Sequence, residues 1–264
     1  MTASTVRTDQ EGTTLLVTIE RPEVHNALDA DVLDQIRHAV EHAASAPELR
    51  CVVITGSGTK AFSAGADLHE LSRMGPDEAH RTMRAGQEAL RAVAEAPVPV
   101  IAAVNGLALG GGFELVLAAT FPVLSERAAL GLPESSLGLM PGYGGTQRLP
   151  RLVGRPVALH LMLTGHRLDA DRAHALGLTP VPPVAPEDLL TETMAIATRI
   201  GAQGPGAVRS ILEATGRGGD GPLAAGLAVE TGLAALAIAG AESTEGIAAF
   251  LERRSPDFAT EEPA

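Results

Sequence analysis

The sequence predicts a mixed α/β fold whose last third is entirely helical. Short apolar runs of strand type alternate with helical patterns as far as about residue 146, and only helical patterns follow. Apolar residues form 45% of the chain and charged residues 20%, which is the balance of an ordinary folded protein. With 264 residues, the chain can bury one large core or two small ones.

The first part of the chain repeats the order strand, loop, helix. Its strand-type runs are short, apolar and bounded by polar residues, Gly or Pro: TLLVTIE (14–20), CVVIT (51–55), VPVIAAVNG (98–106) and FPVL (121–124). Its helical patterns place apolar residues three or four positions apart, at about 33–43, 77–95 and 111–119. This repetition indicates strands that pack beneath helices.

The last third of the chain consists of helical patterns and two connectors. The predicted helices cover 155–163, 170–176, 187–200, 206–215, 223–239 and 244–253. Repeated prolines make the connector at 180–186 stiff, and the glycines of GRGGDG (216–221) predict a mobile connector between two helices. We expect an α/β core over 1–200 and a helical region over 201–264, joined as one continuous structural unit.

Charge and composition argue against several classes of partner. The chain carries 20 basic and 32 acidic residues, a net charge of -12, which disfavours attraction to nucleic acid or to an anionic membrane. Polar residues and a proline interrupt the apolar stretch at 98–124, so a buried strand and helix explain it better than a membrane span. The single Cys51 has no internal disulfide partner and is expected to pack in the core of a cytoplasmic protein.

Two glycine-containing stretches suggest a binding site. KAFSAGADL (60–68) and LALGGGFEL (107–115) both follow strands, and their small residues allow a ligand to approach free backbone N–H groups. A helix that begins near Gly111 leaves the N–H of this residue unpaired at the helix end. Glu114 lies on the same helical face, where it could serve either a site or simply the stability of the first turn.

A second carboxylate stands in LPESSLGLMPGYGGTQRL (132–149). Glu134 follows a proline in a small and apolar context, which fits either a chemical role or an exposed helix-start residue. No paired His or Cys spacing indicates a metal site, and no Gly-x-Ser-x-Gly indicates a nucleophilic serine. The residues alone leave both readings of the two glutamates open.

The ordered motifs resemble the crotonase superfamily, the enoyl-CoA hydratase/isomerase family. The resemblance runs from RPEVHNALD (21–29) through GADL, NGLALGGGFEL and LPESSLGLMPGYGGTQRLPRLVG to EGIAAFLERRSPDF (245–258). It implies a spiral of repeated ββα units in two sheets, with C-terminal helices that assemble homotrimers or homohexamers. It also implies an acyl-CoA thioester as substrate and no separate cofactor, because coenzyme A is part of the substrate.

The resemblance assigns roles to the residues of the site. The N–H groups of Ala66 and Gly111 would form an oxyanion hole for the thioester oxygen. Glu114 and Glu134 match the two glutamates of members that hydrate 2-enoyl-CoA, in which Glu114 would hold and deprotonate a water and Glu134 would protonate C2. Two coupled acids can exchange these roles. Gly142 matches a backbone position near the catalytic water.

The resemblance also assigns contacts with coenzyme A. The residues that would bind substrate or coenzyme A are Lys60, Ala64, Gly65, Asp67, Leu68, Phe250 and Arg253. Lys60 is the single lysine of the chain and could equally be an exposed residue without a role. Arg253 stands where relatives often carry a lysine that reaches the phosphates, including those of a neighbouring subunit.

Three readings of function remain open from the sequence. The glutamate pair favours a 2-enoyl-CoA hydratase, a hydro-lyase of lipid metabolism. A double-bond isomerase or a specialised dehydratase could use the same scaffold, and a non-catalytic relative that binds coenzyme A or RNA is the third. We expect the acyl pocket between 68–95 and 137–143, which shows no charged or aromatic signature of a substrate, and Thr120-Phe121 departs from the small residue and Asp common in the family.

Overall fold

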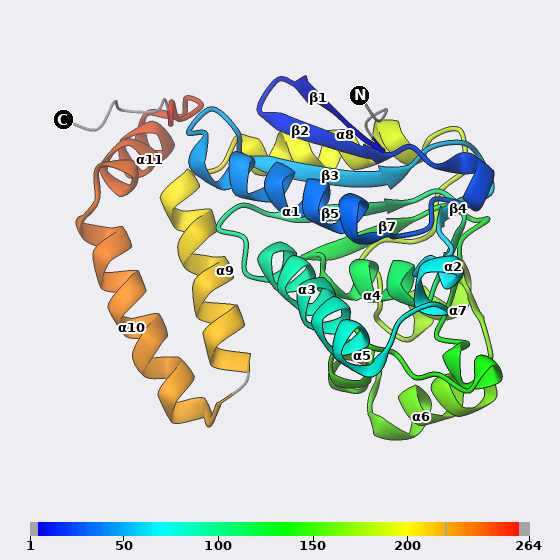
Figure 1. The fold of residues 1–264 in the computed structure, drawn as a ribbon. Coiled ribbons are helices and arrows are strands. Elements are labelled where there is room, and N and C mark those ends of the chain that lie inside the picture. The colour runs from blue at the N-terminus through cyan, green and yellow to red at the C-terminus, as the bar shows by residue number, and fades with distance from the viewer. Residues whose placement is uncertain (1–4, 220, 259–264) are drawn as a thin grey trace.

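The main sheet of the protein has five strands in the order β1-β2-β3-β5-β7. The computed structural model in Figure 1 describes residues 5–219 and 221–258. The strands are β1 (Val6–Glu11), β2 (Thr14–Ile19), β3 (Cys51–Gly56), β5 (Val100–Val104) and β7 (Phe121–Leu124). β1 pairs with β2 in antiparallel fashion, and the remaining pairs are parallel. All four predicted strand-type runs are therefore confirmed.

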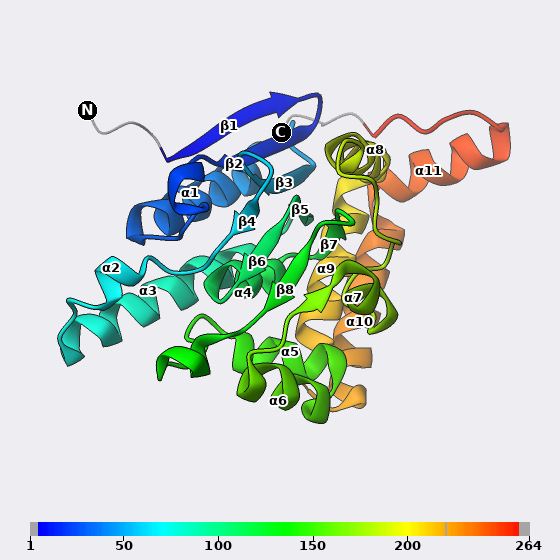
Figure 2. The ribbon, with the colours of Figure 1, turned by 90° about the vertical axis from the view of Figure 1, so that its right-hand side faces the viewer.

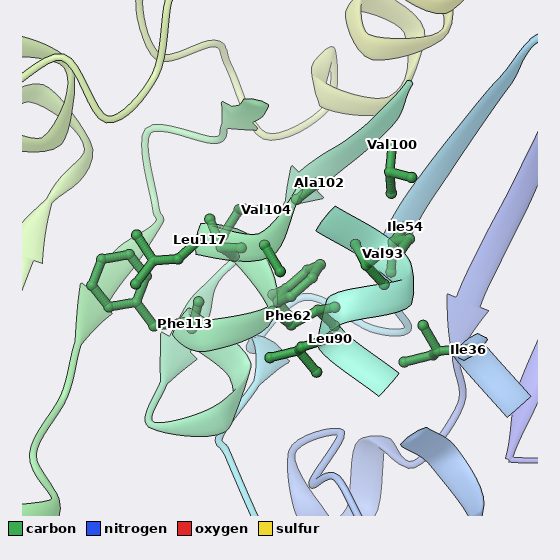
Figure 3. Packing of buried hydrophobic residues seen from close by; sticks show 14 of the residues in the cluster. Ile36, Ile54, Phe62, Leu90, Val93, Val100, Ala102, Val104, Phe113 and Leu117 are labelled. Atoms are coloured by element: carbon green, nitrogen blue, oxygen red, sulfur yellow. The ribbon is translucent and has the colours of Figure 1, made fainter. Parts of the chain in front are cut away.

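Both faces of this sheet are buried, which explains why its central strands are mostly apolar instead of alternating apolar and polar residues. Val52 and Ile54 of β3 face one core cluster, whereas Cys51 and Val53 face another. The first cluster lies beneath α1 (Ala30–Ser45), α3 (Pro76–Ala94) and α4 (Gly111–Ala118), and Figure 3 shows its packing. The second cluster lies beneath α8 (Leu189–Gly201). Cys51 is fully buried, as predicted, and burial raises the pKa of its thiol to about 12.

A second sheet continues the strands of the first. Its order is β4-β6-β8-β9, and its strands are β4 (Ala61–Ser63), β6 (Leu107–Leu109), β8 (Ala129–Gly131) and β9 (Leu168–Asp169). β3 runs into β4, β5 into β6 and β7 into β8, and helices follow the first two of these pairs. This is the expected repeat of ββα units. The sequence did not reveal these strands because two or three residues are too short for a period to be recognised.

Strand β1 was also missed, for a different reason. It is an edge strand whose six residues, VRTDQE, are mostly exposed beyond Val6. Such a sequence shows no apolar alternation, although its backbone pairs with β2 along the whole strand. Backbone pairing with an apolar neighbour, rather than its own composition, makes this segment a strand.

The remaining helices complete the core and form an arm. Short helices and turns lie between the strands and around the lower part of the core: η1 (Pro22–Val24), α2 (Leu68–Leu71), η2 (Glu134–Leu137), α5 (Gly145–Val153), α6 (Arg155–Thr164) and α7 (Ala170–Ala175). The arm consists of α9 (Pro205–Gly219), α10 (Leu223–Ala239) and α11 (Ala241–Glu252), and it stands to one side of the core in Figure 1. The division of the chain at residue 200 stays a prediction.

Only the end of the glycine-rich run at 216–221 connects two helices, whereas we expected the whole run to do so. Helix α9 continues through it to Gly219, and residue 220 lies outside the described residues. A Cβ on Gly226 of α10 would lie 3.1 Å from the Cα of Gly218. The absence of side chains here lets α9 and α10 approach closely, and this packing outweighs the low helix propensity of glycine.

Thr120 and Phe121 have a structural role between α4 and β7. The Val100 N–H donates to Thr120 Oγ1 at 2.9 Å, and the Thr120 N–H donates to the Val100 carbonyl at 2.8 Å. Phe121 packs against the second core cluster. The two residues thus join the start of β7 to the start of β5.

None of the helices in the described residues is by itself long and apolar enough to span a membrane. The pair α10 and α11, which meet at a bend of 66°, meets the length and composition requirements only when taken together.

The first core cluster predicts a clear effect on stability. Leu90 is 0% exposed on α3, so Leu90→Ala should lower the free energy of unfolding by about 2–5 kcal/mol through a cavity. Leu163→Ala is the matched control, because Leu163 is 71% exposed, and it should change stability by less than about 0.5 kcal/mol. Urea unfolding followed by circular dichroism at one protein concentration measures both. Equal effects would contradict this packing.

Candidate active site

Two backbone loops meet at the carboxyl ends of β4 and β6, which are parallel neighbours. Gly65 has φ +101°, and Gly110 has φ +50°, conformations that favour glycine. A Cβ on Gly65 would lie 2.7 Å from the Leu109 carbonyl oxygen and 3.3 Å from the Gly111 nitrogen. A Cβ on Gly112 would lie 2.3 Å from the Ser63 carbonyl oxygen, so a side chain there would separate the loops.

This contact leaves two backbone N–H groups free side by side. The residues on either side of Ala66 pair with Leu28: the Leu28 N–H donates to the Gly65 carbonyl, and the Asp67 N–H donates to the Leu28 carbonyl. The Ala66 N–H therefore points away from Leu28. Gly111 is the first residue of α4, as predicted, and its N–H precedes the first bond of the helix. Among the described residues, neither N–H donates a hydrogen bond. A Cβ on Gly111 would lie 3.5 Å from the Ala66 nitrogen, so both donors could hold one oxygen atom.

Glu114 stands in the first turn of α4 and is 2% exposed. Its Oε1 accepts hydrogen bonds from the Tyr143 N–H at 2.8 Å and the Gly145 N–H at 2.7 Å. Burial raises the pKa of Glu114, while these two N–H groups and the charge of Arg148 oppose the rise. Stabilising the first turn would not require burial against a loop 29 residues away, so the reading of Glu114 as a helix-start residue is insufficient.

The loop that holds Glu114 is itself fixed by Arg148. The Arg148 Nη1 donates to the Tyr143 carbonyl at 2.9 Å from α5, the helix that follows the loop. On the other side, Gln87 Nε2 of α3 donates to the Gly142 carbonyl at 2.8 Å. Gly142 therefore lies beside Glu114, and the loop connects three helices at this point.

Glu134 begins η2 on the other side of the glycines. A Cβ on Gly110 would lie 3.1 Å from Glu134 Oε1, which places this carboxyl group at the start of α4. Its Oε2 is buried and has no hydrogen-bond partner among the described residues. Burial raises the pKa of Glu134 to about 7, and the charge of Glu114 acts in the same direction. A buried carboxyl oxygen without a partner is more consistent with a chemical role than with an exposed helix start.

Of the residues that we expected at the nucleotide side, Lys60 is exposed and Asp67 is half-buried. Lys60 lines a pocket of about 390 Å³ together with His25, Ser57 and neighbouring residues. The Asp67 carboxylate already has partners within the protein, since it accepts hydrogen bonds from the His69 N–H at 3.0 Å and from Arg21 Nη2 at 3.2 Å. Burial opposes the effect, but these two partners hold the pKa of Asp67 below its usual value.

The other expected contacts fall into two groups. Ala64 and Leu68 flank residues 65–67, the loop that carries the Ala66 N–H, and Leu68 is half exposed at the start of α2. Phe250 is 82% exposed on α11, and Arg253 follows the end of that helix. Figures 1 and 2 both show α11 far from α4, so these two residues do not reach the glutamates of their own chain.

Two residues of the site were missed in the sequence. The sequence assigns no role to Arg148, because its contact with the Tyr143 carbonyl depends on the fold. Tyr143 stands at the end of the segment 137–143 in which we expect the acyl pocket, and its ring packs beside Gly111. It is the single tyrosine of an aromatic-poor chain, and that rarity was the available signal.

The chain is similar to known proteins over most of its length. The enoyl-CoA hydratase/isomerase family model matches residues 9–261. A crotonyl-CoA hydratase from Syntrophomonas wolfei is 41% identical over 91% of this chain and 92% of its own length. A short-chain-enoyl-CoA hydratase from Clostridium acetobutylicum is 35% identical over 96% and 97%. The crystal structure of an enoyl-CoA hydratase from Bacillus anthracis superposes with a TM-score of 0.94 at 36% identity, covering 97% of this chain and 100% of that one. The chain therefore belongs to the enoyl-CoA hydratase/isomerase family.

Proposed function

We propose that the protein is an enoyl-CoA hydratase, which reversibly adds water across the 2,3-double bond of a 2-enoyl-CoA thioester. One observation carries this proposal: the buried carboxyl group of Glu114 and the half-buried carboxyl group of Glu134, whose Oε2 is buried, flank a pair of free backbone N–H groups at the start of α4. The names of relatives about 40% identical to the chain support the same reaction. Coenzyme A enters as part of the substrate, so the reaction needs no separate cofactor.

The two N–H groups would hold the thioester oxygen. When water adds at C3, electrons of the double bond move toward the carbonyl, and negative charge develops on this oxygen. Donors that are already fixed at Ala66 and Gly111 stabilise that charge without reorganising, and the loss of one such donor typically costs about 2.7–4 kcal/mol in barrier.

The surroundings of the glutamates support different roles for them. Glu114 receives two N–H bonds and lies near the charge of Arg148, so its ionised form is the better stabilised of the two. Ionised Glu114 would take a proton from water as the resulting hydroxide bonds to C3. Glu134 has one unpartnered oxygen and a pKa near 7, so at neutral pH a large fraction is protonated. It would deliver its proton to C2, and the two transfers together add one water molecule.

The nucleotide part of coenzyme A carries negative charge, so this acidic protein must supply local positive charge to bind it. We assign it to the pocket beside Lys60, with Ala64, Gly65 and Leu68 along the path to the oxyanion hole. Arg253 and Phe250 lie too far from their own site, so they would act on the site of a neighbouring subunit.

We also propose that the protein is a homotrimer or homohexamer in the cytoplasm. The arm exposes large apolar side chains along α10 and α11: Leu223, Leu227, Leu236, Ile238, Ile247, Phe250 and Leu251. Large apolar side chains exposed in this number are typical of a subunit interface. The cytoplasmic location is supported by a single cysteine that is a buried thiol.

Hydration of crotonyl-CoA, followed by loss of the enone absorbance, tests the proposed reaction. Glu114→Gln and Glu134→Gln should each lower kcat by about 10²–10⁴-fold, because each removes one proton transfer. Glu187→Gln on the surface is the matched control and should leave kcat unchanged. A 3-enoyl-CoA substrate tests the isomerase alternative. An isomerase would be favoured if the wild type hydrates no 2-enoyl-CoA, Glu114→Gln still isomerises the 3-enoyl-CoA and Glu134→Gln does not. Folded protein that binds coenzyme A and converts neither substrate would indicate the non-catalytic reading.

The pKa of Glu134 predicts the pH dependence of hydration. A raised pKa means that the acid keeps its proton up to about pH 7, so kcat/KM should decline as pH rises through this value. At low pH, protonation of Glu114 should lower the rate again. Initial rates between pH 5 and 9 give the profile, and a rate that stays constant from pH 6 to 9 would contradict the acid role of Glu134.

Light scattering coupled to size-exclusion chromatography tests the assembly. The expected mass is three or six times the 27.1 kDa of one chain. Leu236→Glu combined with Ile238→Glu should yield a smaller species, because it places charge at two exposed apolar positions of α10. A monomeric wild-type protein would contradict the proposed assembly.

A further inference from the structure

The ring of Tyr143 has no assigned function, yet its position is fixed from both sides. Its backbone N–H binds Glu114 Oε1 and its carbonyl accepts from Arg148 Nη1, so the direction of its side chain is set by the same contacts that hold the carboxylate. The residue is 4% exposed. Burial raises the pKa of its hydroxyl to about 12, so the side chain is neutral under all conditions in which the enzyme would work.

Glycines face the ring on two different helices. A Cβ on Gly86 of α3 would lie 2.2 Å from Cε1 and 2.5 Å from Cδ1 of Tyr143. A Cβ on Gly111 of α4 would lie 3.1 Å from Cδ2 and Cε2 on the opposite edge. The ring therefore fills the space between α3 and the first residue of α4, and any side chain on Gly86 would displace it.

This space adjoins the place where the acyl chain must begin. The thioester carbonyl would lie against the N–H groups of Ala66 and Gly111, and the Gly111 backbone is in van der Waals reach of the ring. Met83 closes the same side, because a Cβ on Gly142 would lie 2.4 Å from its sulfur, and Gln87 binds the Gly142 carbonyl. A chain that continues past C4 toward α3 would meet the tyrosine ring.

We propose that Tyr143 is a specificity-determining residue that closes the acyl pocket and restricts the protein to short-chain 2-enoyl-CoA substrates. The inference rests on the proposed function for its substrate class. The ring acts by occupying volume, so the effect belongs to the aromatic group and not to the hydroxyl. Ala at this position keeps the N–H and the carbonyl that hold Glu114, and Phe keeps the ring.

A chain-length series tests the proposal. We expect the wild type to hydrate crotonyl-CoA with a kcat/KM at least about tenfold above that for 2-dodecenoyl-CoA, since a few excluded methylenes give discrimination of this size. Tyr143→Ala should raise the kcat/KM for 2-dodecenoyl-CoA, relative to that for crotonyl-CoA, by about tenfold or more. Tyr143→Phe, the matched control, should keep the wild-type ratio within about threefold. Wild-type protein without a chain-length preference, or an equal loss on both substrates in Tyr143→Ala, would overturn the proposal.

Binding separates this proposal from the proposed reaction. Calorimetric titration with butyryl-CoA and dodecanoyl-CoA needs no turnover, so it reports on the pocket even if the protein hydrates nothing. Tyr143→Ala should gain affinity for dodecanoyl-CoA relative to butyryl-CoA, and Tyr143→Phe should not. If the relative affinities stay unchanged, Tyr143 does not close the acyl pocket. Thermal unfolding of both variants checks that they are folded.

Discussion

The site depends on the direct contact between two backbone segments, the loop after β4 and the start of α4. Gly112 touches the Ser63 carbonyl so closely that even a methyl group would not fit, and Gly65 lies against Gly111 in the same way. This contact turns two N–H groups toward one point. The buried strands beneath supply the rigidity, because β3 and β5 run directly into the strands β4 and β6 from which the loops leave.

The difference between the two glutamates follows from their separate anchors. Arg148 fixes the loop at 142–145, the loop donates two hydrogen bonds to Glu114, and burial within α4 completes the environment of this carboxylate. Glu134 stands on a short turn outside that arrangement and keeps an oxygen without a partner. The two carboxyl groups thus acquire different proton affinities through their different burial, hydrogen-bond partners and charged neighbours, which the spacing of 20 residues does not reveal.

Much of the fold was predictable, because the strands of the main sheet are apolar on both faces and the helices carry regular apolar stripes. The start of α4 at Gly111 was predicted as well. Prediction failed where structure depends on distant partners: β1 is a strand through its pairing with β2, and Gly218 is helical through its contact with Gly226. The same reason hid Tyr143, which contacts residues of α3 and α4, and Arg148, which donates to the Tyr143 carbonyl.

The oxyanion donors and the carboxyl groups belong to different parts of the covalent structure. The donors are main-chain atoms, fixed by glycine packing, whereas the acids are side chains that a single base change can replace. A lineage could therefore exchange the proton-transferring groups while it keeps the polarised thioester. A scaffold with this division can change the reaction that it catalyses without first losing its hold on the intermediate.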